Sequence, residues 1–259
     1  MNKFRLNPRC IKCDEEIFCM PDIGECIWIY QLETSQFKKI EIDNPNKVRI
    51  AITNFVKIGE KLFAVSKGLK QILRIDIKRK IIEKYYNLGS FLDGEIAGSV
   101  IVGSELYCVS ATTSYIFKIN LDTNKSEKYM LPNIRNKLHT ICFDGEDFWL
   151  SGYCKELYVW NEKKNTIRIV RNFPIEFDLN YCVEEKMLNT DIVEYNTPLF
   201  LYSVPMRNYI WFFPFRTGEI IYVDKKTYKI YTFEIGKSDI YSKRPTKYLY
   251  LGIRYLFQY

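Results

Sequence analysis

Few residues of this chain are suited to acid–base chemistry. His139 is its only histidine, and a lone histidine can act as a general base near neutral pH. A carboxylate such as Glu184 would complete an acid–base pair for a lyase or a hydrolase. A histidine held by ordinary structural contacts is the preferred interpretation, because an acid–base pair needs a geometry that no sequence shows. Sites that need several histidines are excluded.

The cysteines form a second group with possible chemistry. Four of the eight cysteines lie close together, and Cys10-Ile11-Lys12-Cys13 is formally a CxxC motif, followed by Cys19 and Cys26. A zinc site would need further ligands, and the sequence has neither a second CxxC nor a nearby histidine. We therefore predict reduced, buried thiols and no metal or cofactor. The sequence contains no P-loop, dinucleotide-binding, nucleophile-elbow or HExxH motif.

The elements that carry these residues follow from a five-fold repeat. Each copy has a turn and then a strand centred on an aromatic anchor residue. The copies are Asp14 to Phe18, Gly59 to Phe63, Gly103 to Tyr107, Gly145 to Trp149 and Arg207 to Trp211. The first three intervals, from 14 to 59, 59 to 103 and 103 to 145, are 45, 44 and 42 residues. This period predicts an all-β fold, a β-propeller with five four-stranded blades.

The rest of each repeat can be read in the same way. Innermost strands are expected at Ile50 to Val56, Glu95 to Val102, Leu138 to Phe143 and Leu199 to Val204. Turns led by Asp or Asn, such as Asp76 and Asn120, are expected to join the third strand to the fourth. Outer strands alternate charged and apolar residues, as expected where one face meets water. The residue after each anchor is apolar and should face the core.

The ends of the repeat array can be interpreted in two ways. Residues 248–259 add one or two strands after the fifth copy. They would either complete the first blade and close a five-bladed ring, or begin a sixth blade. Pro8 lies in the first expected strand and cannot donate to a ladder, which favours closure on the first blade. One domain then spans residues 1–259, with an insertion at about 172–197.

Loops between second and third strands should open around the channel mouth, on the same face as the connections between blades. The candidate ligand contacts in these loops are Lys70, Thr112, Tyr153, Lys155 and Arg216. The acidic insertion lies on this face, and we expect a lid or a docking element there, the alternative being a surface loop. Asn180 is expected to cap a short helix that includes Val183 and Met187.

Composition limits the partners. The net charge of +7 comes from basic groups spread over the outer hairpins, which indicates a solvated rim and argues against nucleic acid. We expect a monomeric cytoplasmic protein without a membrane span, because the first residues lack an apolar signal region and no stretch of about 18 apolar residues occurs.

Over residues 14–233 the repeats resemble the kelch-like and quinoprotein- or YVTN-like propellers, without the kelch double glycine or the WD dipeptide. This resemblance implies a binding or scaffold module for a protein, peptide or glycan at the loop face. The chain also resembles the streptogramin lyase type of propeller, which implies a lyase that uses a channel-face histidine with a metal.

Overall fold

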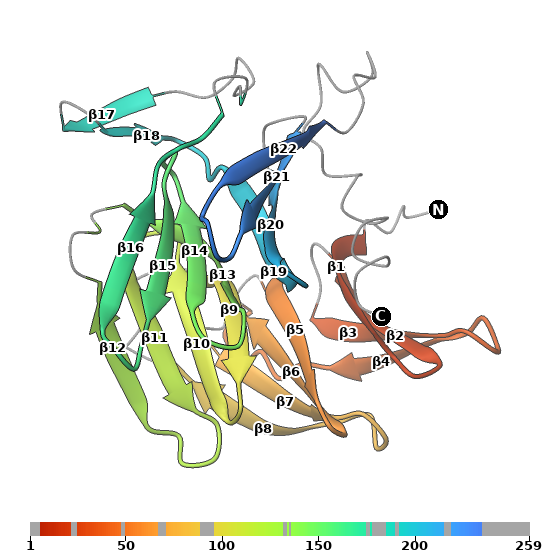
Figure 1. Ribbon diagram of the computed structural model, residues 1–259. Coiled ribbons are helices and arrows are strands. Elements are labelled where there is room, and N and C mark those ends of the chain that lie inside the picture. Colours follow the sequence, from red (N-terminus) through yellow and green to blue (C-terminus); the bar gives the residue numbers. More distant parts are fainter. Residues whose placement is uncertain are drawn as a thin grey trace.

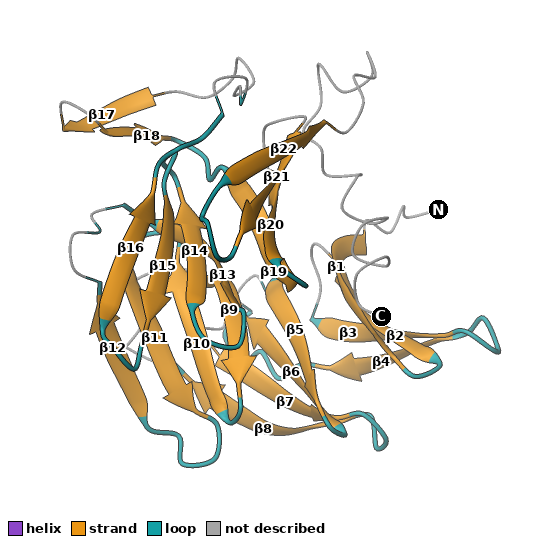
Figure 2. Cartoon of the chain, in the orientation of Figure 1, coloured by secondary structure: helices purple, strands orange, loops and turns teal. Residues whose placement is uncertain are grey.

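The computed structural model describes residues 6–21, 25–47, 50–66, 71–88, 96–131, 134, 136–174, 177, 185–189, 192–214 and 219–234. All regular structure in these residues is β-strand (Figure 2). Five four-stranded antiparallel sheets follow one another along the chain, and in each the strand order is the sequence order. The predicted propeller with five blades is confirmed. Within the described part of the chain, no helix has the length and hydrophobicity needed to span a bilayer.

The blades are named here in chain order. Blade one holds β1 (Leu6–Cys13), β2 (Glu16–Pro21), β3 (Cys26–Gln31) and β4 (Phe37–Glu41). Blade two holds β5 (Ile52–Ile58), β6 (Lys61–Ser66), β7 (Gln71–Asp76) and β8 (Ile81–Asn87). Blade three holds β9 (Ile96–Val102), β10 (Glu105–Ser110), β11 (Tyr115–Asn120) and β12 (Ser126–Met130). Blade four holds β13 (Leu138–Phe143), β14 (Phe148–Gly152), β15 (Leu157–Asn161) and β16 (Thr166–Val170). Blade five holds β19 (Phe200–Met206), β20 (Tyr209–Pro214), β21 (Glu219–Asp224) and β22 (Ile230–Glu234).

The innermost strands form a continuous series. β1 contacts β5, β5 contacts β9, β9 contacts β13 and β13 contacts β19. The blades therefore follow one another in chain order around the innermost strands (Figure 1). No comparable contact joins β19 to β1 among the described residues. The described part of the ring therefore has a first blade and a last blade that do not pack on each other.

Two turns recur in every blade and explain the repeated residue types. The turn between the first and second strands has one residue with a positive φ, namely Asp14, Gly59, Gly103, Gly145 or Arg207. Glycine adopts this left-handed conformation without a Cβ clash, which accounts for the three glycines of the repeat. The turn between the third and fourth strands also has one such residue, namely Ser35, Lys80, Asn124, Asn165 or Tyr228.

The Asp and Asn residues that lead the second of these turns bond their own backbone. Asn120 Oδ1 accepts from the backbone N–H of Thr123 at 2.7 Å, and Asp224 Oδ1 accepts from that of Thr227 at 2.8 Å. This is the turn chemistry expected from the sequence, and the predicted hairpins are confirmed.

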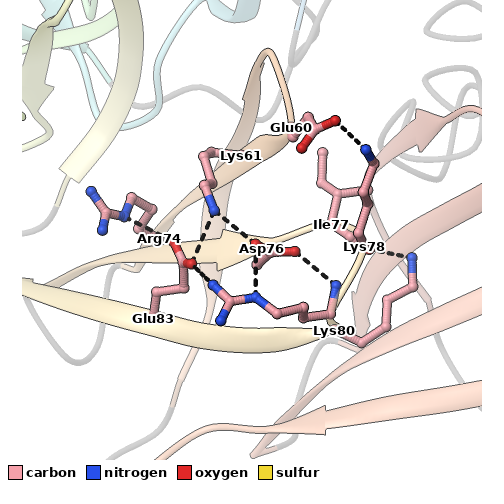
Figure 3. Close-up of polar contacts among 9 residues, drawn as sticks. Glu60, Lys61, Arg74, Asp76, Ile77, Lys78, Lys80 and Glu83 are labelled. Carbon is pink, nitrogen blue, oxygen red and sulfur yellow. Dashed lines mark hydrogen bonds and ion pairs between the residues drawn. The ribbon is translucent and has the colours of Figure 1, made fainter.

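The corresponding turn of blade two carries a cluster of charges (Figure 3). Asp76 accepts from the backbone N–H of Arg79 at 2.7 Å and from Lys61 Nζ at 2.7 Å. These two hydrogen bonds hold the pKa of Asp76 below its usual range. Lys61 Nζ also lies 2.9 Å from Glu83 Oε1 and is the main cause of a lowered Glu83 pKa. Lys80 pairs with Glu16 and so joins blade two to blade one.

The core lies between blades. The anchor aromatics of blades one to four face the following blade, and in blades two to four the residues on either side of the anchor face the preceding blade. Tyr107, for example, packs with blade four, but Leu106 and Cys108 pack with blade two. The residues after the anchors, Cys19, Ala64, Cys108, Leu150 and Phe212, are all buried, as predicted. Both faces of the inner blades are therefore core surfaces, held together by the burial of apolar area.

Blade one corrects one part of the sequence interpretation. β1 pairs with β2 from Leu6↔Pro21 to Cys13↔Glu16, and the register shifts between Leu6 and Cys10. Pro8 lies in that irregular part of the ladder, where its missing N–H costs nothing. The inference that the Pro8 stretch is a poor partner for its own blade was wrong. The expected strand at residues 248–253 lies outside the described residues.

The insertion is also different from the prediction. β17 (Glu185–Asn189) and β18 (Ile192–Tyr195) form an antiparallel hairpin in which Met187 pairs with Val193, so the expected helix through Met187 is wrong. Asn189, Thr190 and Asp191 are turn-forming residue types, and β-branched Ile192 and Val193 favour a strand. Asn180 and Val183 lie outside the described residues.

Candidate functional site

The connections between blades and the loops between second and third strands meet at one end of blades three and four. The backbone N–H of Leu138, at the start of blade four, donates to the carbonyl of Thr113 in the loop of blade three at 3.2 Å. The N–H groups of Tyr195 and Leu199 donate to the carbonyls of Tyr153 and Gly152 at 2.8 and 3.0 Å. The end of the insertion and the loop of blade four therefore form one rigid surface.

His139 lies at this end, on the innermost strand β13. Its ring is 6.0 Å from the ring of Tyr153, with an interplanar angle of 81°, so the two rings meet edge to face. Lys137 Nζ lies 5.6 Å from the centroid of the Tyr153 ring. Both rings are half-buried and Lys137 is exposed. The structure thus brings together His139 and Tyr153, which were predicted separately, and adds Lys137.

Thr112 lies on the neighbouring loop of blade three. It is exposed, and its hydroxyl is 2.9 Å from Ser110 Oγ. The adjacent Thr113 carbonyl is bonded to Leu138 as described above, so the Thr112 loop is attached to the start of β13. Thr112 therefore borders the His139 side of blade four.

Lys155, a predicted ligand contact, lies against the first part of the insertion. Its ammonium donates to the carbonyl of Phe177 at 3.2 Å and lies 5.7 Å from the Phe177 ring. Phe177 is buried and stacks with Phe200 of β19 at 6.0 Å. Lys155 thus fixes the first part of the insertion against blade five, and a ligand would have to compete for its charge.

A buried carboxylate, missed by the sequence interpretation, holds this loop from below. Glu156 is 5% exposed, and its Oε2 accepts from Asn136 Nδ2 at 3.0 Å and from the Tyr158 hydroxyl at 2.5 Å. Arg171 Nε donates to Oε1 at 2.6 Å. Burial and the bond to Glu156 raise the pKa of Tyr158, so its proton stays in place. No sequence signal marked Glu156, because two of its partners, Asn136 and Arg171, come from other segments of the chain.

The remaining predicted site residues, Lys70, Arg216 and Glu184, lie outside the described residues. The described part of the candidate site consists of His139, Tyr153, Lys137 and Thr112. Lys155 and Glu156 support it. What this arrangement offers at the surface is the Tyr153 phenol and the Lys137 cation, because both ring nitrogens of His139 are buried.

The cysteines of the CxxC motif do not converge. Cys10 and Cys13 are both in β1, where residues three apart point to opposite faces of the sheet. Cys13 is buried among the apolar residues of blades one and two, and burial raises its pKa to about 11. No group of three or more His, Cys, Asp or Glu side chains suited to a metal occurs among the described residues.

A surface cleft of about 440 Å³ lies elsewhere, at the edge between blades four and five. Asn172 and Pro174 line one side of it, and Tyr222 and Tyr231 line another. None of the predicted site residues lines this cleft. We therefore base the candidate site on the contacts at the channel mouth and not on the size of a cavity.

Solved structures place the fold among known propellers. The chain is similar to virginiamycin B lyase from Staphylococcus aureus, a propeller enzyme solved with quinupristin as a catalytically inactive histidine-to-alanine variant, with a TM-score of 0.63 and 17% identity over 92% of this chain and 73% of that one. It is also similar to the extracellular domain of a one component system from B. thetaiotaomicron, with a TM-score of 0.62 and 17% identity over 89% of this chain. The match spans only 30% of that second chain. No protein-family model and no curated protein matches the sequence. Identities of 17% show the β-propeller fold alone.

Proposed function

We propose that this propeller is a binding module that holds a protein, peptide or glycan at the loop face of blade four, beside the channel mouth. The observation that carries the proposal is that contacts with neighbouring residues hold Tyr153 in place. Its carbonyl is bonded to Tyr195, and its ring is bordered by His139 and Lys137. A surface that is already ordered before binding loses little entropy when a ligand arrives.

The chemistry of the surface suggests which ligands suit it. The Tyr153 ring offers an apolar body with a polar tip, which is common at binding sites. Lys137 adds a cation, so a ligand that carries a carboxylate or another anion is favoured over a neutral one. Lys155 and Glu156 contribute by keeping the loop in place.

Screening a glycan array and a library of acidic peptides with the purified protein tests this function. A bound ligand should lose at least about tenfold in affinity on Tyr153→Ala and on Lys137→Ala, because each removes a direct contact. Lys164→Ala is the matched control, since Lys164 is also an exposed lysine and lies on the hairpin at the opposite end of blade four. Equal losses for Lys137→Ala and Lys164→Ala would contradict the proposed site.

A second candidate function is a lyase or hydrolase that uses His139 as the acid–base group. It is favoured by the position of His139 beside the Tyr153 hydroxyl-bearing ring and by the similarity to a lyase whose histidine variant is described as inactive. Both ring nitrogens of His139 are buried in this structure, so the substrate would have to displace the groups that cover them. His139 would then take a proton from the substrate, and the Tyr153 phenol would donate one to the leaving group.

Quinupristin is a direct probe of this second candidate. The lyase interpretation expects its consumption by the wild-type protein and loss of that turnover in His139→Ala and Tyr153→Phe. If quinupristin stays intact while a ligand from the screen binds and depends on Tyr153, the binding function stands and the enzyme candidate does not.

A further inference from the structure

Three of the clustered cysteines share one face of blade one, in which β1, β2 and β3 lie side by side (Figure 1). Cys10 of β1 is the direct cross-strand partner of Cys19 of β2, and Cys19 is in turn the partner of Trp28 of β3. Cys26 lies two residues before Trp28 in β3 and so points to the same side of the sheet. The residues that follow or precede them face blade two, namely Ile11, Phe18 and Ile27. The three thiols therefore lie on the side of blade one that is turned away from blade two.

One pair in this group has the spacing of a disulfide. Direct partners in an antiparallel ladder have Cα atoms about 4.5 or 5.5 Å apart, which is within the roughly 4.4 to 6.8 Å that a disulfide spans. Cys10 and Cys19 are such partners. Cys19 and Cys26 are diagonal neighbours, and the Cα atoms of diagonal pairs are about 7 to 8 Å apart, beyond that limit. Cys13 lies in the core between blades one and two, on the opposite face of β1.

The two thiols of this pair differ in their access to solvent. Cys10 is half-buried, whereas Cys19 is 3% exposed and its thiol donates to the carbonyl of Trp28 at 3.6 Å. Burial, with smaller contributions from Cys10 and Cys26, raises the pKa of Cys19 to about 12. A dissolved oxidant therefore reacts first at Cys10, and Cys19 is held beside it as the partner thiol.

We propose that Cys10 and Cys19 form a reversible oxidation site, in which hydrogen peroxide joins the two thiols in a disulfide between β1 and β2. In the first step the Cys10 sulfur attacks one peroxide oxygen and the O–O bond breaks. The hydroxide that leaves takes up the Cys10 proton as water, and Cys10 becomes a sulfenic acid. In the second step the Cys19 sulfur attacks the Cys10 sulfur, the S–O bond breaks, and the hydroxyl group leaves with the Cys19 proton as a second water. The two sulfurs lose two electrons in total, and the peroxide gains them.

The geometry of the ladder favours a bond that can be opened again. Direct partners have Cβ atoms about 4.5 to 5.5 Å apart, somewhat more than the roughly 3.5 to 4.5 Å of a relaxed disulfide, so closing the bond strains the ladder. Cys10 is the last regular partner before the register shifts towards Leu6, so β1 can adjust on that side without breaking regular pairs. Strained disulfides are reduced more easily than structural ones, and we expect glutathione to open this bond. The site is independent of the ligand proposed for the channel mouth.

Peptide mapping of the wild-type chain after treatment with hydrogen peroxide tests the site. Trypsin releases Cys10 on residues 10–12, while the other three cysteines of the cluster stay together on residues 13–38. The expected product is a link between these two peptides, two hydrogen atoms lighter than their sum, which fragmentation places at Cys19 and glutathione reverses. Unchanged thiols, sulfinic acid on Cys10 without a link, a link that glutathione does not open, or an equal yield of links to the other two cysteines would each overturn the proposal.

Two variants show whether the ladder selects this pair. Cys19→Ser removes the partner thiol, so the yield of the link should fall at least about tenfold, and Cys10 should stop at a sulfenic acid that dimedone traps. Cys26→Ser is the matched control, because Cys26 is half-buried like Cys10 and lies on the same face, and it should leave the yield unchanged. Equal losses for the two variants would overturn the proposal.

The same mapping of the wild-type chain in urea is a control that needs no variant. In the unfolded chain the shortest loop is the easiest to close, so links from Cys10 to Cys13 should become the main product. If the pattern of links in the native chain equals the pattern in urea, the fold does not select Cys19 and the proposal is overturned.

Discussion

A Cβ atom on Gly98 would lie 2.6 Å from the carbonyl oxygen of His139 and 3.2 Å from the backbone nitrogen of Ile141. Gly98 is on β9 and His139 on β13, so the innermost strands of blades three and four approach each other through this glycine. The absence of a side chain at position 98 thus sets how close the two blades come, and with it the position of His139 relative to the loop of blade three.

Replacing Gly98 with alanine should therefore destabilise the protein by the upper part of the about 1 to 3 kcal/mol that overpacking costs, because backbone atoms cannot move aside as a side chain can. Urea unfolding followed by tryptophan fluorescence measures the change. Gly59→Ala is the control: its φ of 54° gives a strain of about 1 kcal/mol, but no atom lies within 4 Å of the added methyl. Equal losses for the two variants would show that the contact between β9 and β13 is not limiting.

The pH dependence of stability should report the cluster around Asp76. The pKa of Asp76 is lowered in the folded protein by the Arg79 N–H and by Lys61, so its contribution is present at neutral pH. It is lost as the pH falls below the unfolded value of about 4 and towards the lower folded value. Wild type should thus be more stable than Asp76→Asn at pH 7, and the difference should shrink between about pH 4 and pH 2.

Thermal unfolding of both proteins across this pH range makes the measurement. Asparagine is a fair replacement because Asn120 and Asn161 occupy the same turn position in blades three and four. Glu83 shares Lys61 and Arg79 with Asp76, so a pH-dependent difference between the two proteins reports the charges of this cluster. A difference between wild type and variant that stays constant with pH would rule out the charge of Asp76 as its source.

Equivalent turn positions should respond to glycine with opposite signs. Ser35 and Tyr228 both have a positive φ, 55° and 59°, so glycine relieves backbone strain at each. Ser35 is exposed, and Ser35→Gly should be neutral or stabilising by up to about 1 kcal/mol. Tyr228 stacks on Trp149 at 5.8 Å and lies 4.2 Å from the Arg168 guanidinium carbon. The loss of these ring contacts should outweigh the relief of backbone strain, so Tyr228→Gly should lower the stability by about 1 to 2 kcal/mol. Denaturant midpoints of the two variants decide the sign.

Particular residues show how far the sequence could predict this structure. The turns at Gly59, Gly103 and Gly145 were readable because a local backbone conformation selects the residue type. The five blades follow, since each turn comes with a strand of the right spacing. The hairpin around Met187 was missed because a short apolar spacing fits a helix face and a strand equally well.

The site was predictable only in part, and for a different reason. His139 and Tyr153 could be named as candidates because the residue type of His139 and the loop position of Tyr153 are informative one at a time. The support by Glu156, and the use of Lys155 to hold Phe177, depend on contacts between segments far apart in the chain. Such pairings have no local pattern, so a single sequence does not contain them in readable form.

Thiol reactivity should follow burial within the described strands. Burial raises the pKa of Cys142 to about 12 and that of Cys13 to about 11, so at pH 8 few of these thiols are ionised and few are reachable. Cys10 and Cys26 are half-buried and should be alkylated before the buried thiols. Mass spectrometry after timed exposure to iodoacetamide gives the order in which the cysteines react. In denaturant this order should disappear, because all the thiols are then exposed. Fast labelling of Cys13 in the native protein would contradict the packing between blades one and two.

Glu156 provides the most direct link between stability and the proposed ligand site. Glu156→Ala removes the acceptor for Asn136 and Tyr158, two buried donors, and leaves Arg171 without its ion pair. A cost of about 2 to 4 kcal/mol is expected, because buried polar groups that lose a partner keep their desolvation penalty. The loop that carries Tyr153 should loosen at the same time, which lowers ligand affinity although Glu156 does not touch the ligand.

Two control variants separate these effects. Glu156→Gln keeps one acceptor and should recover part of both losses. Glu146→Ala, at an exposed turn of the same blade, should change neither stability nor affinity. Unfolding curves and binding of the ligand from the screen are measured on the same samples. A variant that loses stability but binds with unchanged affinity would mean that the loop keeps its shape without Glu156, and the ordered Tyr153 surface would then need another support.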